Sequence, residues 1–205
     1  MSLSSTKRLK HLVRQQNRKV LYADCNRAYI GLESIESWTG RLIKGETAEP
    51  EGTVSLYEPS DILFGKLRPY IAKVHLATEA GACSTEALVL RTTRDYVAAY
   101  LKYVLLDPCR IDEINSSTFG AQMPRASWDF IGNCSVPVAD LDTQKAIAAF
   151  LDREIARIDQ LIAKKERQAV ALTEKLSRVI EAATNSGQST RLKHLRSFLT
   201  SGSRG

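Results

Sequence analysis

Hydrophobic positions divide the chain into two parts with different periodicities. Up to about residue 140, short apolar runs alternate with turns rich in Gly, Pro and Asp. The β-branched and aromatic residues in these runs favour strands over helices. We predict a helix near 95–106 from its helical spacing of apolar residues, and strands at 20–22, 29–32, 53–57, 62–64, 71–74 and 87–90. This combination predicts an α+β fold with a twisted, mixed or mostly antiparallel sheet.

Residues 142 to about 184 follow a helical pattern, with no Pro or Gly and many Ala, Glu, Lys, Arg and Leu residues. Asp142 or Thr143 can cap the start of this helix, and Asn185 or Gly187 can end it. At 1.5 Å per residue, its roughly 43 residues would span about 65 Å, which exceeds the diameter of a small domain.

Apolar residues in this helix recur at alternating intervals of four and three, which is typical of a coiled coil. The seam consists of Leu151, Ile155, Ile158, Ile162, Leu172, Leu176 and Val179, with Ala169 and Ala183. Lys165 interrupts it. Because an isolated helix cannot bury such a seam, we expect a partner helix. The alternative is a long surface helix that packs on its own domain.

One five-residue sequence occurs twice. Arg8-Leu9-Lys10-His11-Leu12 recurs letter for letter at 191–195, directly after the helix and a Gly-containing break. The first twenty residues are basic and contain no acidic residue, so they could be a transit peptide. A targeting sequence that is cleaved off has no reason to recur, however. We therefore expect a repeat unit of about 180 residues. The predicted organisation is a globular domain (1–140), a spacer helix (141–185) and the start of a second, truncated unit (186–205).

Charge and cysteine usage narrow the class of protein. The net charge of +6 and the pI of about 9.2 favour a polyanionic partner such as nucleic acid. No apolar run approaches the roughly 20 residues of a membrane-spanning helix. The four Cys residues at 25, 83, 109 and 134 lie far apart, without a CxxC or Cys/His cluster. This spacing supports no metal site, and we expect reduced core cysteines in a cytoplasmic protein.

The sequence carries no recognisable catalytic motif. It has neither a GxxxxGK[ST] phosphate loop nor a GxGxxG fingerprint, and its three His residues are dispersed. Asp107-Pro108-Cys109-Arg110 only faintly resembles the Asp-Pro-Pro-Tyr loop of adenine methyltransferases, because the aromatic that stacks a flipped base is missing. We interpret it as a helix end turned by Pro108. The chain is therefore predicted to lack catalytic residues and cofactors.

Two polar loops suit contact with DNA. The first, 64–70, places Lys66 and Arg68 around a glycine turn, and the second, 116–125, is rich in hydroxyl groups. Cations and hydroxyls bind phosphates, and Gln or Arg side chains read purine edges. The alternative is a pair of solvated loops that make structural turns.

Four passages together resemble the specificity subunit of a type I restriction–modification system. They are 29–40, 61–73 with its Asp-Ile-Leu-Phe-Gly-Lys-Leu-Arg-Pro-Tyr, 82–91, and 120–152 at the junction with the helix. The resemblance covers nearly all of residues 7–196. It implies a full subunit with two target-recognition domains, each of which reads half of a split DNA site. It also implies two conserved helices paired as an antiparallel coiled coil, and methyltransferase and motor-nuclease subunits that supply all catalysis.

This chain has one such domain and one such helix, which leads to a hypothesis of homodimerisation through 142–184 and an inverted-repeat site. We expect phosphate contacts from Lys66, Arg68 and Arg125 and base contacts from Ser117, Thr118 and Gln122. Methyltransferase docking or packing on the domain is expected for Gln144, Ile147 and Phe150. The rival interpretations are a coiled-coil adaptor with incidental charge and a stand-alone DNA-binding regulator.

Overall fold

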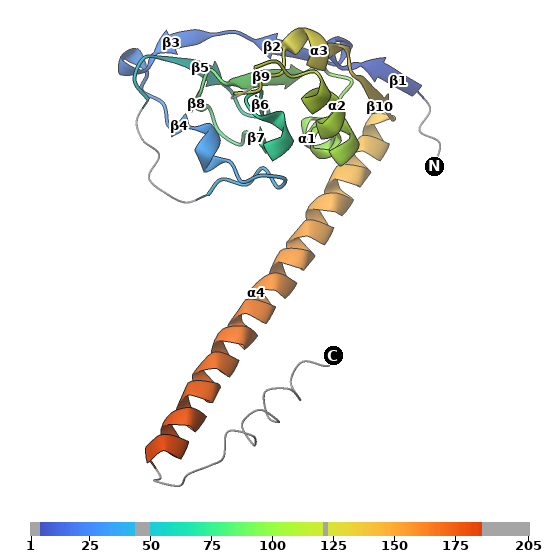
Figure 1. Ribbon diagram of the computed structural model, residues 1–205. Helices are drawn as coiled ribbons and strands as arrows, with labels where there is room; N and C mark the ends of the chain where they lie inside the picture. The colour runs from blue at the N-terminus through green and yellow to red at the C-terminus, as the bar shows by residue number, and fades with distance from the viewer. Residues whose placement is uncertain (1–4, 44–49, 121–122, 186–205) are drawn as a thin grey trace. The chain divides into compact units, whose positions relative to one another are not determined.

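The computed structural model describes residues 5–43, 50–120 and 123–185 (Figure 1). The chain divides into two compact units, Met1–Leu151 and Asp152–Gly205. The strands are β1 (Ser5–Arg8), β2 (Val13–Gln16), β3 (Lys19–Leu21), β4 (Tyr29–Ile30), β5 (Thr53–Tyr57), β6 (Ile62–Gly65), β7 (Val74–Leu76), β8 (Gly81–Cys83), β9 (Ala87–Thr92) and β10 (Ser135–Val138). The α-helices are α1 (Ala98–Leu106), α2 (Pro108–Ser116), α3 (Trp128–Asn133) and α4 (Leu141–Asn185).

The strands of the first unit form three sheets within the described residues, which confirms the predicted α+β class. One sheet has the antiparallel order β2-β9-β6-β7, and a second has the order β3-β5-β8-β4, in which β4 runs parallel to β8. A third pairs β1 with β10, so that the start of the unit lies beside the strand that precedes α4. The sheets are therefore mixed and mostly antiparallel, as the sequence predicts.

The core fills both faces of the β2-β9-β6-β7 sheet. Phe64 of β6 and Leu90 of β9 pack with α1, α2 and α3 on one face. Leu63 and Val89, the next residues along the same strands, pack against Tyr57 and other residues of the β3-β5-β8-β4 sheet. Because both faces are buried, these strands read as unbroken apolar runs, which is why the sequence pattern locates them.

The two leucines in the first copy of the repeated pentapeptide belong to the core. Leu9 is fully buried and Leu12 nearly so, and the Leu9 N–H donates to the Cys134 carbonyl over 3.0 Å. Residues Leu9–His11 form a 3-10 helix that contacts α3. The second copy, 191–195, lies outside the described residues.

Three expectations about these segments need correction. The strand expected at 71–74 is wrong: Pro69–Ile71 form a 3-10 helix between Arg68 and Ala72, both at positive φ, and β7 begins at Val74. Pro108 lies just beyond the end of α1, as the sequence predicts. It also begins α2, whose first turn Asp107 caps by accepting from the Cys109 N–H. Cys109 is exposed rather than in the core, since it lies on that first turn.

α4 runs from Leu141 to Asn185 and confirms the predicted long helix. Its N-terminal cap is Asp140, not the expected Asp142 or Thr143. The Asp140 carboxylate accepts from the N–H and the hydroxyl of Thr143, and these hydrogen bonds lower the pKa of Asp140. Among the residues that the structure describes, no helix is long and apolar enough to cross a membrane.

Candidate nucleic-acid interface

Main-chain hydrogen bonds gather four segments at one end of β6. β6 stops at Gly65, and the next residue, Lys66, bonds through its N–H to the Glu86 carbonyl and through its carbonyl to the Ala126 N–H, each over 3.0 Å. The Arg68 N–H donates to the Pro124 carbonyl over 2.8 Å. We call residues 65–68, 84–86, 117–120 and 123–126 the loop cluster.

An antiparallel β-bridge within the loop cluster pairs Phe119 with Arg125. The Phe119 N–H donates to the Arg125 carbonyl over 3.2 Å, and the Arg125 N–H donates to the Phe119 carbonyl over 3.0 Å. Arg125 also forms an antiparallel β-bridge with Leu67. The backbone therefore brings Lys66, Arg68 and Arg125 together, although Arg125 is far from the other two in sequence.

The three basic residues differ in how they are engaged. The Arg125 guanidinium pairs with the Glu86 carboxylate, with an Nε–Oε2 distance of 2.9 Å, and this interaction raises the pKa of Arg125. Lys66 and Arg68 have no ion-pair partner among the described residues, and the Arg68 side chain is exposed. The phosphate contacts predicted for all three stay predictions, and the geometry favours Lys66 and Arg68 because Glu86 engages Nε and Nη2 of Arg125.

The two hydroxyls predicted to contact bases donate hydrogen bonds to main-chain carbonyls of α2. The Ser117 hydroxyl donates to the Ile114 carbonyl over 2.7 Å, and the Thr118 hydroxyl donates to the Asn115 carbonyl over 2.8 Å. Both therefore close the C-terminal end of α2. Only their oxygen lone pairs remain for a base edge, and their base-contact role stays a prediction. Gln122 lies outside the described residues.

Sequence reasoning overlooked the apolar side chains of this region. Phe119 is 63% exposed, Met123 48% and Tyr70 47%. The sequence signal was present, since Phe119-Gly120 interrupts a polar loop, but it reads equally well as a core residue before a turn.

Asp61 holds together two of the passages that carry the family resemblance. Its side chain is fully buried and accepts two hydrogen bonds from the Arg91 guanidinium, over 2.7 and 2.8 Å, and one from the Glu58 N–H. These contacts join the start of β6 to the end of β9. This part of the recognisable sequence therefore has a structural role, because a buried carboxylate needs such partners.

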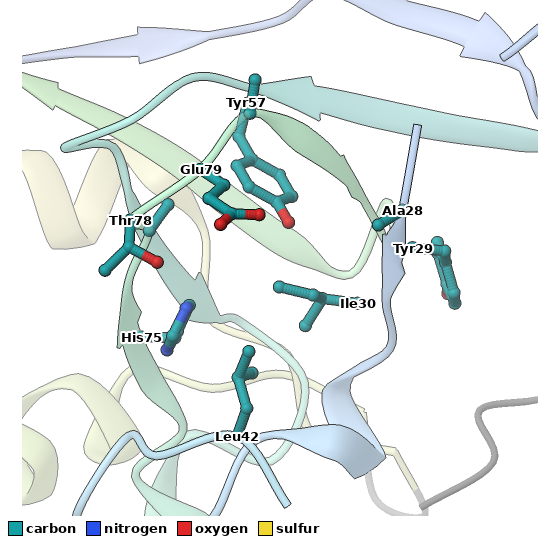
Figure 2. A pocket seen from close by; sticks show the side chains of 10 residues that line it. Ala28, Tyr29, Ile30, Leu42, Tyr57, His75, Thr78 and Glu79 are labelled. Atoms are coloured by element: carbon teal, nitrogen blue, oxygen red, sulfur yellow. The ribbon is translucent and has the colours of Figure 1, made fainter. Parts of the chain in front are cut away.

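A cavity of about 250 Å³ lies apart from these loops (Figure 2). Ile30 and Leu42 line one side, and Tyr57, His75 and Glu79 line the other. Burial lowers the pKa of His75, whose Nδ1 lies 2.8 Å from the Gly40 carbonyl oxygen, and burial raises the pKa of Tyr57 to about 12. The side chains of His75 and Tyr57 are therefore neutral near pH 7. The cavity is below the roughly 300–1,000 Å³ typical of ligand pockets, and it offers no paired nucleophile and base.

The first turns of α4 pack on the globular unit. The Gln144 side chain is fully buried and bonded to three main-chain groups, and Ile147 packs on the core, so both match the packing alternative. Phe150 is 51% exposed.

The predicted seam lies farther along α4 and is largely exposed. Ile158, Ile162, Leu172 and Val179 are between 44% and 67% exposed. Leu151, Ile155 and Leu176 are half-buried. Pairing of this seam with another helix stays a prediction.

Comparisons with known proteins agree on one family. No family model matches the chain. A curated protein, the type I restriction enzyme EcoDI specificity subunit of Escherichia coli, is 26% identical over 168 residues, which are 80% of this chain and 37% of that protein.

Solved structures share the fold. The HsdS subunit from Thermoanaerobacter tengcongensis matches with a TM-score of 0.61 and 17% identity, over 86% of this chain and 47% of that one. A chain from a structure of the type I R-M system, described for its complex assembly and conformational transition, matches with a TM-score of 0.66 and 17% identity, over 91% and 51%. This chain thus spans about half the length, or less, of the relatives it matches. The curated relative is similar in sequence and the solved structures share the fold, so this chain is similar to the specificity subunits of type I restriction–modification systems.

Proposed function

We propose that this chain recognises one half of a split DNA sequence as the specificity component of a type I restriction–modification complex. Partner methyltransferase and motor-nuclease subunits would then carry out adenine methylation and restriction in the cytoplasm. The observation that carries the proposal is the loop cluster, which presents Lys66 and Arg68 on a rigid backbone within a domain of this family.

The electrostatics of the loop cluster support DNA as the ligand. Arg125 neutralises Glu86, so the two remaining cations, Lys66 and Arg68, dominate the local charge. The whole chain carries a net charge of +6, which favours approach to a polyanion. Phosphate contacts of this kind position a protein on the duplex, and contacts to base edges then select the sequence.

We also propose that two copies pair through α4 in an antiparallel coiled coil. The exposed seam residues supply the apolar knobs, and Lys165 lies within the seam as a charged interruption. A two-fold pair of domains would read an inverted repeat, with the helix pair setting the distance between the half-sites.

The DNA proposal is tested by binding of the chain with its cognate methyltransferase subunit to duplex DNA at several salt concentrations. Replacing both Lys66 and Arg68 with Ala should flatten the slope of log affinity against log salt by about two units, because each phosphate contact contributes about 0.9. The control is Lys164→Ala on α4, which should keep the slope. An unchanged slope in the double variant would contradict the assignment.

The dimer is tested by sedimentation velocity. Ile162→Glu should give a monomer, since it would bury an unpaired carboxylate at two places along the seam, one from each copy. Arg167→Glu adds the same side chain on the outer face of the helix, and it should leave the dimer intact. A wild-type chain that sediments as a monomer at tens of micromolar would refute pairing through α4.

A further inference from the structure

The loop cluster carries two large apolar side chains beside its cations. Phe119 is 63% exposed and Met123 is 48% exposed. Phe119 is hydrogen-bonded to Arg125, and the neighbouring residues Pro124 and Ala126 are hydrogen-bonded to the strand-end loop that carries Lys66 and Arg68. An exposed apolar group rimmed by charge is typical of a binding surface.

Hydrogen bonds anchor the backbone of Phe119. Its N–H and carbonyl are both bonded to Arg125, whose neighbour Pro124 is held by the Arg68 N–H. Gly120 follows at a φ of 91°, a left-handed conformation that side chains other than glycine rarely adopt. The Cβ of any larger residue at Gly120 would lie 3.1 Å from the Met123 carbonyl oxygen. The backbone of Phe119 is therefore fixed to the strand-end loop by hydrogen bonds.

The ligand that suits this surface combines negative charge with flat apolar faces. Phosphates match Lys66 and Arg68, and the exposed faces of a base step match an aromatic ring. Phe and Met are among the side chains that proteins insert between base pairs, where they unstack and kink the duplex. An exposed Phe on an anchored backbone, beside cations proposed to contact phosphates, has the arrangement that such insertion requires.

We propose that Phe119 is a wedge that inserts between two base pairs of the recognised half-site, with Met123 packing beside it. The proposal rests on the DNA-recognition function given above. Because unstacking is easiest at pyrimidine–purine steps, the wedge selects half-sites with such a step at the insertion point. Phe119 would thus contribute to specificity without a hydrogen bond to any base.

The test replaces Phe119 with Ala and with Leu, and uses Phe130→Ala on α3 as a control that removes a ring 37% exposed. The chain is assayed with its cognate methyltransferase subunit on duplexes carrying 2-aminopurine in turn at each half-site adenine, in either strand, except the methylated adenines. Wild type should raise the fluorescence at one step. Phe119→Ala should abolish that rise and weaken binding about 10- to 100-fold, as for a lost base–aromatic stack. Phe119→Leu should keep much of both, and Phe130→Ala should match wild type.

Two results would overturn the wedge while leaving the proposed function intact. In one, Phe119→Ala binds and directs methylation like wild type. In the other, binding weakens without any wild-type fluorescence rise, and replacing one thymine by uracil weakens it equally, which would assign Phe119 to a thymine methyl in the groove. Wild type that neither binds DNA nor directs methylation would overturn both proposals. Circular dichroism of each variant checks the fold, which an exposed side chain should not affect.

Discussion

Gln144 joins the first turn of α4 to the globular unit through three hydrogen bonds. Its Oε1 accepts from the Val97 N–H over 2.8 Å, and its Nε2 donates to the carbonyls of Asp95 and Ala139 over 3.3 and 2.8 Å. The side chain is fully buried, so water cannot replace any of these bonds. We predict that Gln144→Leu, which keeps a similar volume, strongly destabilises the domain.

The magnitude follows from the groups left without partners. Each buried polar group that loses its partner costs about 1–3 kcal/mol, and Gln144→Leu leaves one N–H and two carbonyls. Allowing for partial relaxation, the loss should be about 3–5 kcal/mol, a large part of the 5–15 kcal/mol typical of a domain. Gln144→Glu should not restore the stability of the domain. Its carboxylate can still accept from the Val97 N–H, but it has no donor for the two carbonyl oxygens that it faces.

Urea unfolding, followed by tryptophan fluorescence, measures this loss, since Trp128 packs on the core. Lys145→Ala is the matched control, because its exposed neighbour position should change the unfolding free energy by less than about 0.5 kcal/mol. A loss below about 1 kcal/mol for Gln144→Leu would refute the reasoning that these hydrogen bonds fix α4 to the domain.

Three further perturbations follow from the same structure. Asp61→Ala should lower the unfolding free energy by about 2–4 kcal/mol, because it removes three hydrogen bonds and leaves Arg91 unpaired; an unchanged urea midpoint would contradict this. Lys165→Leu should tighten the proposed dimer in sedimentation equilibrium by completing the seam, and weaker association would argue against the assigned register. Burial lowers the pKa of His75 below 6.5, so the unfolded chain binds that proton more readily. Its contribution to stability is therefore complete above pH 6.5 and is lost as the pH falls through the folded pKa. His75→Gln should reduce the fall in urea midpoint between about pH 7.5 and about pH 5.5. An equal fall in the urea midpoints of variant and wild type would exclude His75 as a cause of this pH dependence.

The sequence pattern located β5, β6 and β9, and it missed β1 and the short strand β8. β5, β6 and β9 bury most of their residues, so their apolar runs stand out. All four residues of β1 are exposed, and this strand is held to β10 by main-chain hydrogen bonds alone. Such pairing leaves no hydrophobic periodicity to read.

The candidate site was predictable only in part for a similar reason. Lys66 and Arg68 follow a strand and a glycine, which marks a basic turn within one short passage. The pairing of Glu86 with Arg125 joins residues 39 positions apart, and no local pattern reports it. The positive φ of Arg68 and Ala72 cannot be predicted from the local sequence either. At Ala72 it prevents an extended strand over 71–74.

Methylation sequencing of DNA from cells that express this chain with its cognate methyltransferase subunit tests the central claim most directly. The account predicts methylated adenines in one split, palindromic motif, because two identical domains related by a two-fold axis would read two identical half-sites. It also predicts that the motif disappears when the chain is omitted. Methylation without a sequence motif, or the same motif with and without the chain, would contradict the claim that this protein selects the DNA sequence.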